Sequence, residues 1–104
     1  REIQYSKPPK YPSTSRDIAM VVSESTPVAE IEKVIKEAGT EILRSVKLFD
    51  IYRGIQVGAG KKSVAYSLTY RHDDRTLTDV ETEEAHAKVV EALKNNLGAS
   101  IRDN

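Results

Sequence analysis

Residues 63–70 alternate strictly between large and small side chains, and this pattern limits the fold more than any other. The large side chains are Val64, Tyr66, Leu68 and Tyr70, and the small ones are Ser63, Ala65, Ser67 and Thr69. Because successive side chains of a β-strand point to opposite faces, the segment predicts a strand with one face in a core and the other uncovered. Such a strand belongs in a sheet that helices cover on one side.

A strand and a helix are predicted before this segment. Apolar residues at every second position predict a strand from Arg16 onwards. They are Ile18, Met20 and Val22. Thr26-Pro27 then predicts a helix start, with Thr26 as the N-cap and Pro27 as the first helical residue. Apolar residues follow at helical spacing up to Gly39, the predicted C-terminal cap.

A further strand and a second helix flank the alternating segment. Residues 43–53 are rich in β-formers and predict a strand, and the glycines within residues 54–60 predict a loop after it. Thr78 and Glu81 have the spacing of a capping box, so the second helix starts there and ends at Gly98. Its apolar stripe is Ala85, Val89, Leu93 and Leu97.

Residues 99–102 complete the pattern as a short last strand, so the order is β-α-β-β-α-β. This order predicts an α+β, ferredoxin-like sandwich, in which two helices cover one face of a four-stranded antiparallel sheet. Prolines and small polar residues make residues 1–15 a predicted extended N-terminal arm, and residues 16–104 the folded domain. The chain of 104 residues starts with Arg, and its one Met lies within the first strand, so we expect a piece of a longer protein.

The formal net charge is zero, but the charges are segregated along the chain. Residues 23–43 and 76–97, which contain the two predicted helices, each hold five acids and two bases, whereas residues 44–75 hold seven bases and three acids. We therefore expect an acidic helical side and a more basic sheet. A basic sheet face suits single-stranded nucleic acid, because cations contact phosphates and flat side chains stack on bases. The alternative is that strand-end cations only protect sheet edges from aggregation.

Several kinds of active site are excluded or disfavoured by the residues. The chain has no cysteine, which removes disulfides, Cys-ligated metals and thiol nucleophiles. Residues 54–63 resemble a P-loop only superficially, since Lys62 stands where the metal-binding hydroxyl belongs and the segment links two strands. His72 and His86 lie in no triad order or metal-ligand spacing, and we find no catalytic constellation. No apolar run reaches the roughly 18 residues of a membrane-spanning helix.

Five landmarks occur in order along nearly the whole chain. They are Tyr11-Pro12-Ser13 leading to Arg16-Asp17-Ile18-Ala19, then Leu48-Phe49-Asp50-Ile51-Tyr52-x-Gly54, Gly60-Lys61-Lys62-Ser63-Val64-Ala65, Arg75-Thr76-Leu77-Thr78-Asp79 and Gly98-Ala99-x-Ile101-Arg102. Together they resemble the ferredoxin-fold anticodon-binding domain at the C-terminus of the bacterial phenylalanyl-tRNA synthetase β subunit. The Phe-Asp-x-Tyr and Arg-Thr-Leu-Thr blocks are the most specific part of this resemblance.

The resemblance implies a non-catalytic part of an ATP-dependent phenylalanine-tRNA ligase. This part would bind the anticodon loop of tRNA(Phe), while aminoacylation takes place on the α subunit. The implied protein partners are the rest of the β subunit and the α subunit, in an (αβ)2 assembly. ATP and Mg²⁺ would act in the parent enzyme, with no cofactor in this domain. The implied setting is translation in the cytoplasm, with no membrane partner.

Carried onto this sequence, the resemblance implies an anticodon-binding site made of Asp50, Tyr52, Ser63, Arg102 and Ala19. Tyr52 would stack on a base, and Asp50 would accept hydrogen bonds from a base edge. Ser63 and Arg102 would add polar and cationic contacts. Ala19, being small, would let a base approach the sheet.

These residues also have ordinary structural alternatives. Simple alternation over residues 46–52 puts Asp50 and Tyr52 on the same strand face as Val46 and Leu48, so that Asp50 and Tyr52 project together. The alternative for Tyr52 is to cap the hairpin, and for Asp50 to cap a local turn. For Ser63 the alternative is an ordinary position at a sheet edge.

Other functional classes stay open at this point. A ferredoxin-like fold hosts many functions, so a protein-docking module or a small-ligand regulatory module without RNA binding is the alternative. A small hydrolase on this fold lacks the helix N-terminus that its phosphate loop needs. Arg16 and Arg75 are further candidates for phosphate contact, but each neighbours an acid, Asp17 or Asp74, with which it would form an ion pair instead.

Overall fold

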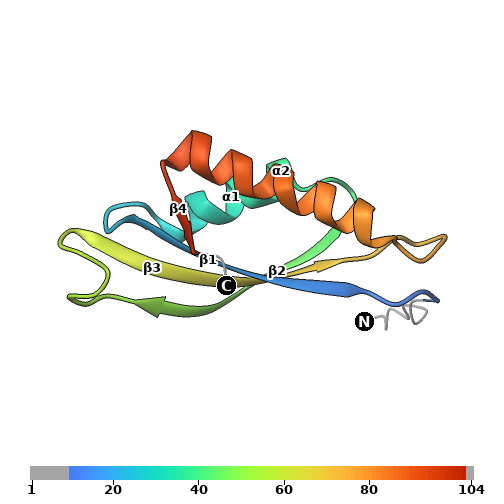
Figure 1. Ribbon diagram of the computed structural model, residues 1–104, viewed down its shortest axis with the longest axis horizontal. Helices are drawn as coiled ribbons and strands as arrows, with labels where there is room; N and C mark the ends of the chain where they lie inside the picture. Colours follow the sequence, from blue (N-terminus) through green and yellow to red (C-terminus); the bar gives the residue numbers. More distant parts are fainter. Residues whose placement is uncertain (1–9, 103–104) are drawn as a thin grey trace, which may run out of the picture.

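The computed structural model describes residues 10–102, and the elements follow the predicted order (Figure 1). The strands are β1 (Thr14–Ser23), β2 (Leu43–Tyr52), β3 (Lys61–Tyr70) and β4 (Ser100–Arg102), and the helices are α1 (Val28–Ala38) and α2 (Asp79–Leu97). The four strands form one antiparallel sheet in the order β2-β3-β1-β4, and both helices lie on one face of it. The predicted α+β, ferredoxin-like sandwich is confirmed.

The start of β1 lies slightly before its predicted position. The strand begins at Thr14, so the last two residues of the predicted arm belong to the sheet. Residues 1–9 of that arm lie outside the described residues, and the division at residue 16 stays a prediction. Within residues 10–102, neither helix is long and apolar enough to cross a membrane.

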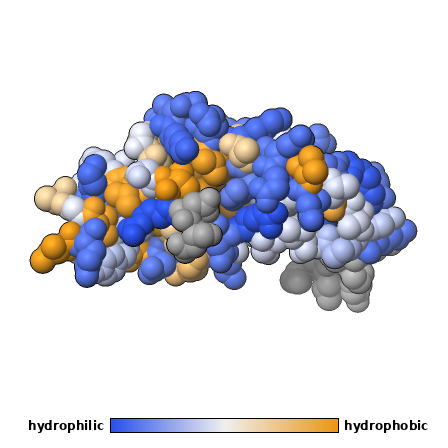
Figure 2. Space-filling view, in the orientation of Figure 1, coloured by the Kyte–Doolittle hydropathy of each residue, from blue (hydrophilic) through white to orange (hydrophobic). Residues whose placement is uncertain are grey.

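The core lies between the sheet and the helices, where the alternation on β3 predicts it. Its β3 members are Val64, Tyr66, Leu68 and Tyr70, all fully buried. They pack with Ile18, Met20 and Val22 of β1, with Ile31, Val34 and Ile35 of α1, and with Ala85, Val89 and Leu93 of α2. Each large apolar side chain of this kind contributes about 1.5–3 kcal/mol when it leaves water. Figure 2 shows hydrophobic residues along the seam between α2 and the sheet.

The two core tyrosines keep partners for their hydroxyl groups. Tyr66 donates to Oε2 of Glu32 over 3.4 Å, and the Tyr70 hydroxyl lies 3.1 Å from Nδ1 of His86. Burial raises the pKa of both phenols, to about 12 for Tyr70. These rings are therefore committed to the core and leave the other face of the sheet to smaller side chains.

Three of the four helix ends lie where the sequence predicts them, and the start of α1 does not. Thr78 and Glu81 form the predicted capping box, and Gly98 ends α2 with a φ of +62°, a left-handed conformation that favours glycine. The predicted N-cap of α1 is wrong by one residue. Thr26 is the last residue of a turn, because its amide donates to Ser23, so Pro27 becomes the N-cap and α1 begins at Val28.

β2 departs from simple alternation because it contains bulges. Its register with β3 shifts at two places, and the second shift inserts Phe49 as an extra residue. As a result Val46 and Leu48 pack against the core, whereas Asp50 and Tyr52 lie on the opposite face. The prediction that all four share one face is wrong, although Asp50 and Tyr52 do project together.

Candidate nucleic-acid interface

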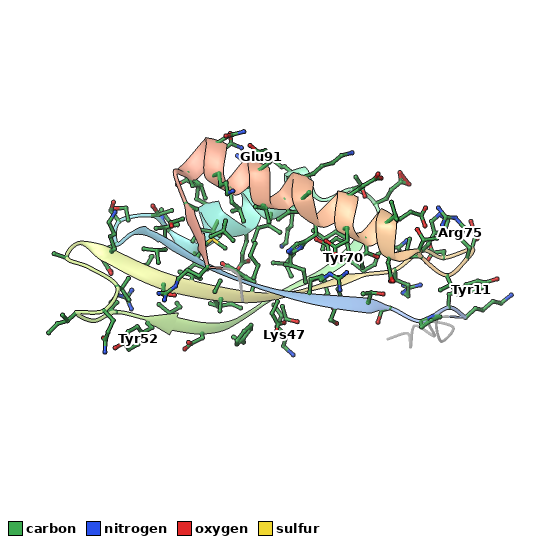
Figure 3. The ribbon with its side chains drawn as sticks, in the orientation of Figure 1. Tyr11, Lys47, Tyr52, Tyr70, Arg75 and Glu91 are labelled. Carbon is green, nitrogen blue, oxygen red and sulfur yellow. The ribbon has the colours of Figure 1, made fainter. Side chains whose placement is uncertain are left out.

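Within residues 10–102, no helix or loop covers the sheet face opposite the helices, which consists mainly of small and polar side chains. β1 contributes Ser15, Asp17, Ala19 and Val21, β3 contributes Ser63, Ala65, Ser67 and Thr69, and β2 contributes Lys47, Asp50 and Tyr52. In Figure 3, Lys47 and Tyr52 project from this side of the sheet, whereas Tyr70 projects toward α2. We call this surface the open face.

The five predicted site residues lie in two neighbouring rows across the open face. The first row, which we call the Asp50 row, is Arg102, Ala19, Ala65 and Asp50, in the order β4, β1, β3, β2. The second, the Tyr52 row, is Ser100, Val21, Ser63 and Tyr52. With strands about 4.8 Å apart and a rise of about 3.4 Å per residue, the two rows span roughly 14 Å by 7 Å. Residues from the start and the end of the chain are thus brought together.

Tyr52 presents an exposed ring that is held from one side. Its exposed fraction is 45%, and its hydroxyl donates a hydrogen bond of 2.7 Å to Oε1 of Gln56 in the β2–β3 loop. The ring lies close to Gly54, where a Cβ atom would come within 2.7 Å of the Tyr52 hydroxyl oxygen. Tyr52 therefore does contact the hairpin loop, as its structural alternative predicts. This contact orients the ring, and the remaining surface of the ring can stack on a flat ligand.

The residues around this ring are small or have free polar groups. Asp50 is exposed and makes no hydrogen bond or ion pair within residues 10–102, so it does not cap a turn there. Ser63 lies on β3, an inner strand, so the alternative of an edge position is wrong. Ala19 lies opposite Ala65, and these two small side chains leave a flat floor in the middle of the Asp50 row.

Most arginines in the described part of the chain are already in ion pairs. The pairs are Arg16 with Glu83, Arg44 and Arg71 with Asp73, Arg53 with Glu24, and Arg75 with Glu81. For Arg16 and Arg75 the ion-pair alternative is confirmed, but the partners are carboxylates of α2 and not the adjacent aspartates. Arg102 is the remaining arginine within residues 10–102, and it forms no ion pair there.

A hollow of about 390 Å³ adjoins the two rows at the β4 edge of the sheet. We call it the β4 hollow, and its lining residues are Val21, Val22, Ser23, Gln56, Val57, Lys61, Gly98, Ser100 and Arg102. Val21 and Ser100 also belong to the Tyr52 row, and Arg102 to the Asp50 row. Because Gln56 holds the hydroxyl of Tyr52, the β2–β3 loop connects the hollow to the exposed ring.

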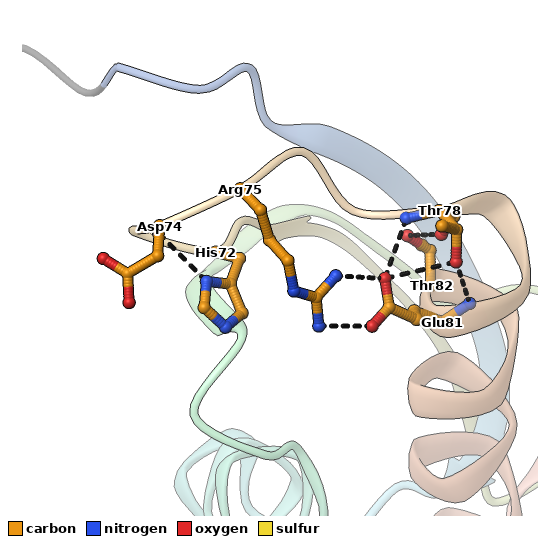
Figure 4. Close-up of polar contacts among 6 residues, drawn as sticks. All are labelled: His72, Asp74, Arg75, Thr78, Glu81 and Thr82. Atoms are coloured by element: carbon orange, nitrogen blue, oxygen red, sulfur yellow. Dashed lines mark hydrogen bonds and ion pairs between the residues drawn. The ribbon is translucent and has the colours of Figure 1, made fainter.

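A second hollow, of about 400 Å³, lies at the opposite end of β2 and β3. We call it the turn hollow, and its lining residues are Thr40, Glu41, Ile42, Arg44, His72, Asp73, Asp74 and Arg75. The Arg75 guanidinium donates two hydrogen bonds to Glu81, whose carboxylate also accepts from Thr78 (Figure 4). The bonds from Arg75 are the main cause that lowers the pKa of Glu81 to about 2, and a hydrogen bond from Arg44 likewise lowers the pKa of Asp73.

Sequence reasoning missed Gln56 and Ser100 as neighbours of the predicted site. Gln56 lies in an irregular loop, and its contact with Tyr52 depends on how that loop folds back. Ser100 joins the Tyr52 row only through the pairing of β4 with β1. Among the described residues, no three His, Asp or Glu side chains gather in a way that would hold a metal ion.

Comparison with known proteins relates this arrangement to a family. The sequence matches the family described as "Ferredoxin-fold anticodon binding domain" over residues 9–102. It is 50% identical over 101 residues to the phenylalanine–tRNA ligase beta subunit of Clostridium tetani, which is 97% of this chain and 13% of that protein. It is 46% identical over 98 residues to the Bacillus subtilis protein of the same name, or 94% of this chain and 12% of that protein. The chain thus spans about an eighth of the length of these relatives.

The element order β-α-β-β-α-β, with two helices on one face of a four-stranded antiparallel sheet, defines a ferredoxin-like domain. The family match covers 94 of the 104 residues of the chain. The chain belongs to the ferredoxin-fold anticodon binding domain family, and the resemblance seen in its sequence blocks is confirmed.

Proposed function

We propose that this chain is the anticodon-binding part of a phenylalanine–tRNA ligase β subunit, and that its open face binds the anticodon loop of tRNA(Phe). Family membership and the similarity to β subunits support this proposal. The observation that carries it is the convergence of the five candidate residues, Ala19, Asp50, Tyr52, Ser63 and Arg102, in the Asp50 row and the Tyr52 row.

Each residue would act through its ordinary chemistry. The exposed ring of Tyr52 stacks on one base. Asp50, a carboxylate without a partner within residues 10–102, accepts hydrogen bonds from amino or imino groups of a base edge. Because a carboxylate repels phosphate, its place on the face favours base recognition over backbone contact. Ser63 adds a hydroxyl and Arg102 a cation, while Ala19 leaves room above the strand.

The parent enzyme supplies the rest of the proposed function. The aminoacylation that this domain would support needs ATP and Mg²⁺, which act outside residues 10–102. The α subunit and the remaining β subunit are the proposed protein partners, in an (αβ)2 assembly in the cytoplasm. In this arrangement the domain increases the selectivity of phenylalanine transfer in translation without taking part in the chemistry.

An NMR titration tests the proposal. The isotope-labelled chain is titrated with a tRNA(Phe) anticodon stem-loop and, separately, with a stem-loop of altered anticodon. We expect shifts clustered on the two rows, and stronger binding of the tRNA(Phe) loop. Tyr52→Ala should weaken that binding about tenfold or more, since stacking on an aromatic is worth about 1–3 kcal/mol.

Phe49→Ala is the matched control, because Phe49 is also an exposed aromatic of β2 but lies in the bulge outside the two rows. It should change binding less than twofold, as expected for a residue without a base contact. Equal shifts with both stem-loops would reduce the open face to a platform that does not read sequence. Binding that Tyr52→Ala leaves intact would contradict the stacking role.

The alternative is a protein-docking module that binds no RNA, and two exposed apolar residues favour it. Ile55, in the β2–β3 loop, is 97% exposed, and Phe49 is 57% exposed on the edge strand β2. Large exposed apolar side chains are common at protein interfaces. In the same titration, the docking alternative predicts no shifts with either stem-loop.

A further inference from the structure

We propose that the β4 hollow is a subsite for one phosphate of the RNA backbone, with Lys61 and Arg102 as its cations and Gln56 as a neutral donor. The inference rests on the proposed function, because it assumes that an RNA loop lies on the open face. It adds a backbone contact, which fixes the register of the loop, beside the base contacts of the two rows.

The charge of the β4 hollow suits a phosphate. Lys61 and Arg102 both line it, and neither side chain forms an ion pair or hydrogen bond within residues 10–102. No carboxylate is among the described residues that line it. The turn hollow has nearly the same volume but includes Glu41, Asp73 and Asp74. Of the two, only the β4 hollow combines unpaired cations with a lining free of acids.

The Gln56 amide offers hydrogen-bond donors to the hollow. Its Oε1 accepts the hydrogen bond from the Tyr52 hydroxyl, which leaves the NH₂ group of Gln56 with two donors and no partner within residues 10–102. The hydroxyl of Ser100 adds another donor to the lining. The side-chain groups of the hollow thus offer mainly donors, which suits the acceptor oxygens of a phosphate.

The size of the β4 hollow and its position beside the Tyr52 row also suit a nucleotide backbone. The hollow of about 390 Å³ has room for a phosphate together with part of its nucleotide. Val21 and Val57 provide apolar surface that suits a ribose beside the phosphate. Because Val21 and Ser100 also belong to the Tyr52 row, a nucleotide stacked on Tyr52 has its neighbouring backbone within reach of the hollow.

The test is a set of stem-loops in which each loop phosphate in turn is replaced by a neutral methylphosphonate. With the unsubstituted chain, neutralising the phosphate that occupies the hollow should weaken binding several-fold. In Lys61→Ala the unmodified stem-loop should already bind more weakly, and the same replacement should cause no further loss. The slope of log K against log salt should fall by about 0.7 in Lys61→Ala, as for one released counterion on a single strand.

Two further variants keep the test sharp. Lys47→Ala removes the same charge from the open face outside the hollow, and it should remain sensitive to the same methylphosphonate. Gln56→Glu keeps an acceptor for the Tyr52 hydroxyl but adds a carboxylate to the hollow, so it should weaken binding of the unmodified stem-loop and not of the neutralised one. If Lys61→Ala stays as sensitive as Lys47→Ala to every methylphosphonate, the subsite is wrong.

The outcomes separate this inference from the proposed function. Coupling between Lys61 and one phosphate, without preference for the tRNA(Phe) anticodon, would support the subsite and contradict anticodon recognition. Preference for that anticodon without any coupling would do the reverse. If no stem-loop binds, a titration with inorganic phosphate decides what the hollow takes. Shifts confined to Gln56, Lys61 and Ser100 would then assign it to free anions and overturn its role in binding RNA.

Discussion

The two ends of the sheet contain hollows of similar size, and each hollow is lined by two or more basic side chains. The two ends differ in whether carboxylates of the described residues pair with those cations. At the turn hollow, Arg44 and Arg75 are held by Asp73 and Glu81 at hydrogen-bond distance. At the β4 hollow, Lys61 and Arg102 have no such partner among the described residues. The volumes are about 400 and 390 Å³, so size does not distinguish the two ends.

The comparison teaches that a count of charges along the chain does not measure the charge that is available to a ligand. Residues 44–75 carry an excess of four bases, seven against three acids. In the folded chain, however, Arg44, Arg53, Arg71 and Arg75 are each paired with a carboxylate, two of them with Glu24 and Glu81 from the acidic segments. The cations of the open face without an ion pair among the described residues include Lys61 and Arg102 at the β4 hollow, and Lys47 nearer the middle of β2.

The largest expected effect comes from removing Arg102 at the β4 hollow, and removing Arg44 at the turn hollow is its control. Arg102→Ala should weaken binding of the tRNA(Phe) stem-loop about tenfold, because a hydrogen bond between charged groups contributes about 1.5–3 kcal/mol. Arg44→Ala removes the same charge from the paired end and should change binding less than twofold. Fluorescence anisotropy with a labelled stem-loop measures both. Similar losses in the two variants would erase the distinction between the ends.

The next effect concerns the chain segment that brings β4 to the hollow. Gly98 has a φ of +62°, and nothing lies within 4 Å of an added Cβ atom there. Gly98→Ala should therefore cost about 1 kcal/mol from backbone strain alone, or about 4–8 °C in Tm for a domain of this size. Gly98→Asn should cost less, since Asn tolerates the left-handed region better. Equal Tm values for the two variants, measured by circular dichroism, would count against a backbone origin.

A smaller effect should follow when Arg44 and Arg71, at the turn hollow, lose their ion-pair partner. Asp73 accepts from both Arg44 and Arg71, so Asp73→Asn removes the carboxylate that neutralises two arginines. Binding should then rise about twofold for tRNA(Phe) and altered stem-loops alike, with a steeper salt dependence, because free cations contact any phosphate. Asp74→Asn makes the same charge change at a carboxylate that forms no ion pair within residues 10–102, and it should have less effect. A rise for the tRNA(Phe) loop alone would contradict this mechanism.

The smallest effect is a pH dependence at the start of α2. Arg75 lowers the pKa of Glu81 to about 2 from an ordinary value of 4.5, so the folded chain binds fewer protons than the unfolded chain between these values. The stabilisation is complete above about pH 4.5 and disappears as the pH falls toward 2. Glu81→Gln should lower the Tm slightly at pH 7 and not at pH 2. Glu84→Gln is the control, because Glu84 forms no ion pair within residues 10–102. A difference in Tm that does not change with pH would exclude the ion pair as its cause.

Local patterns in the sequence predicted the elements, because each depends on residues close together in the chain. The alternation around Tyr66 predicts the buried face of β3, and Thr78 with Glu81 predicts the start of α2. The helix α1 begins one residue later than predicted, because the hydrogen bond from the Thr26 amide to the Ser23 carbonyl makes Thr26 part of a turn. The site residues came from the family resemblance, and the structure gathers them in two rows, but their contacts with RNA stay predictions.

Features that depend on distant residues could not be read in the same way. The partner of Arg16 is Glu83, which is 67 positions away, and no local pattern indicates it. The hydrogen bond between Tyr52 and Gln56 depends on the path of the loop. The bulges in β2 did leave a signal in the spacing of its apolar residues. Those residues are Leu43, Val46, Leu48 and Ile51, and their steps of three, two and three positions do not fit a regular strand.

The same bulges make β2 longer than its partner requires. Its ten residues, 43–52, lie opposite residues 63–70 of β3, and Arg44 and Phe49 are the two that have no counterpart. In a regular strand the loss of one residue exchanges its faces. In β2, deletion of Phe49 would straighten the strand and leave Ile51 toward the helices and Tyr52 toward the open face. The strand that carries Tyr52 is thus one that can lose a residue in evolution or in design and keep the same side chains on the open face.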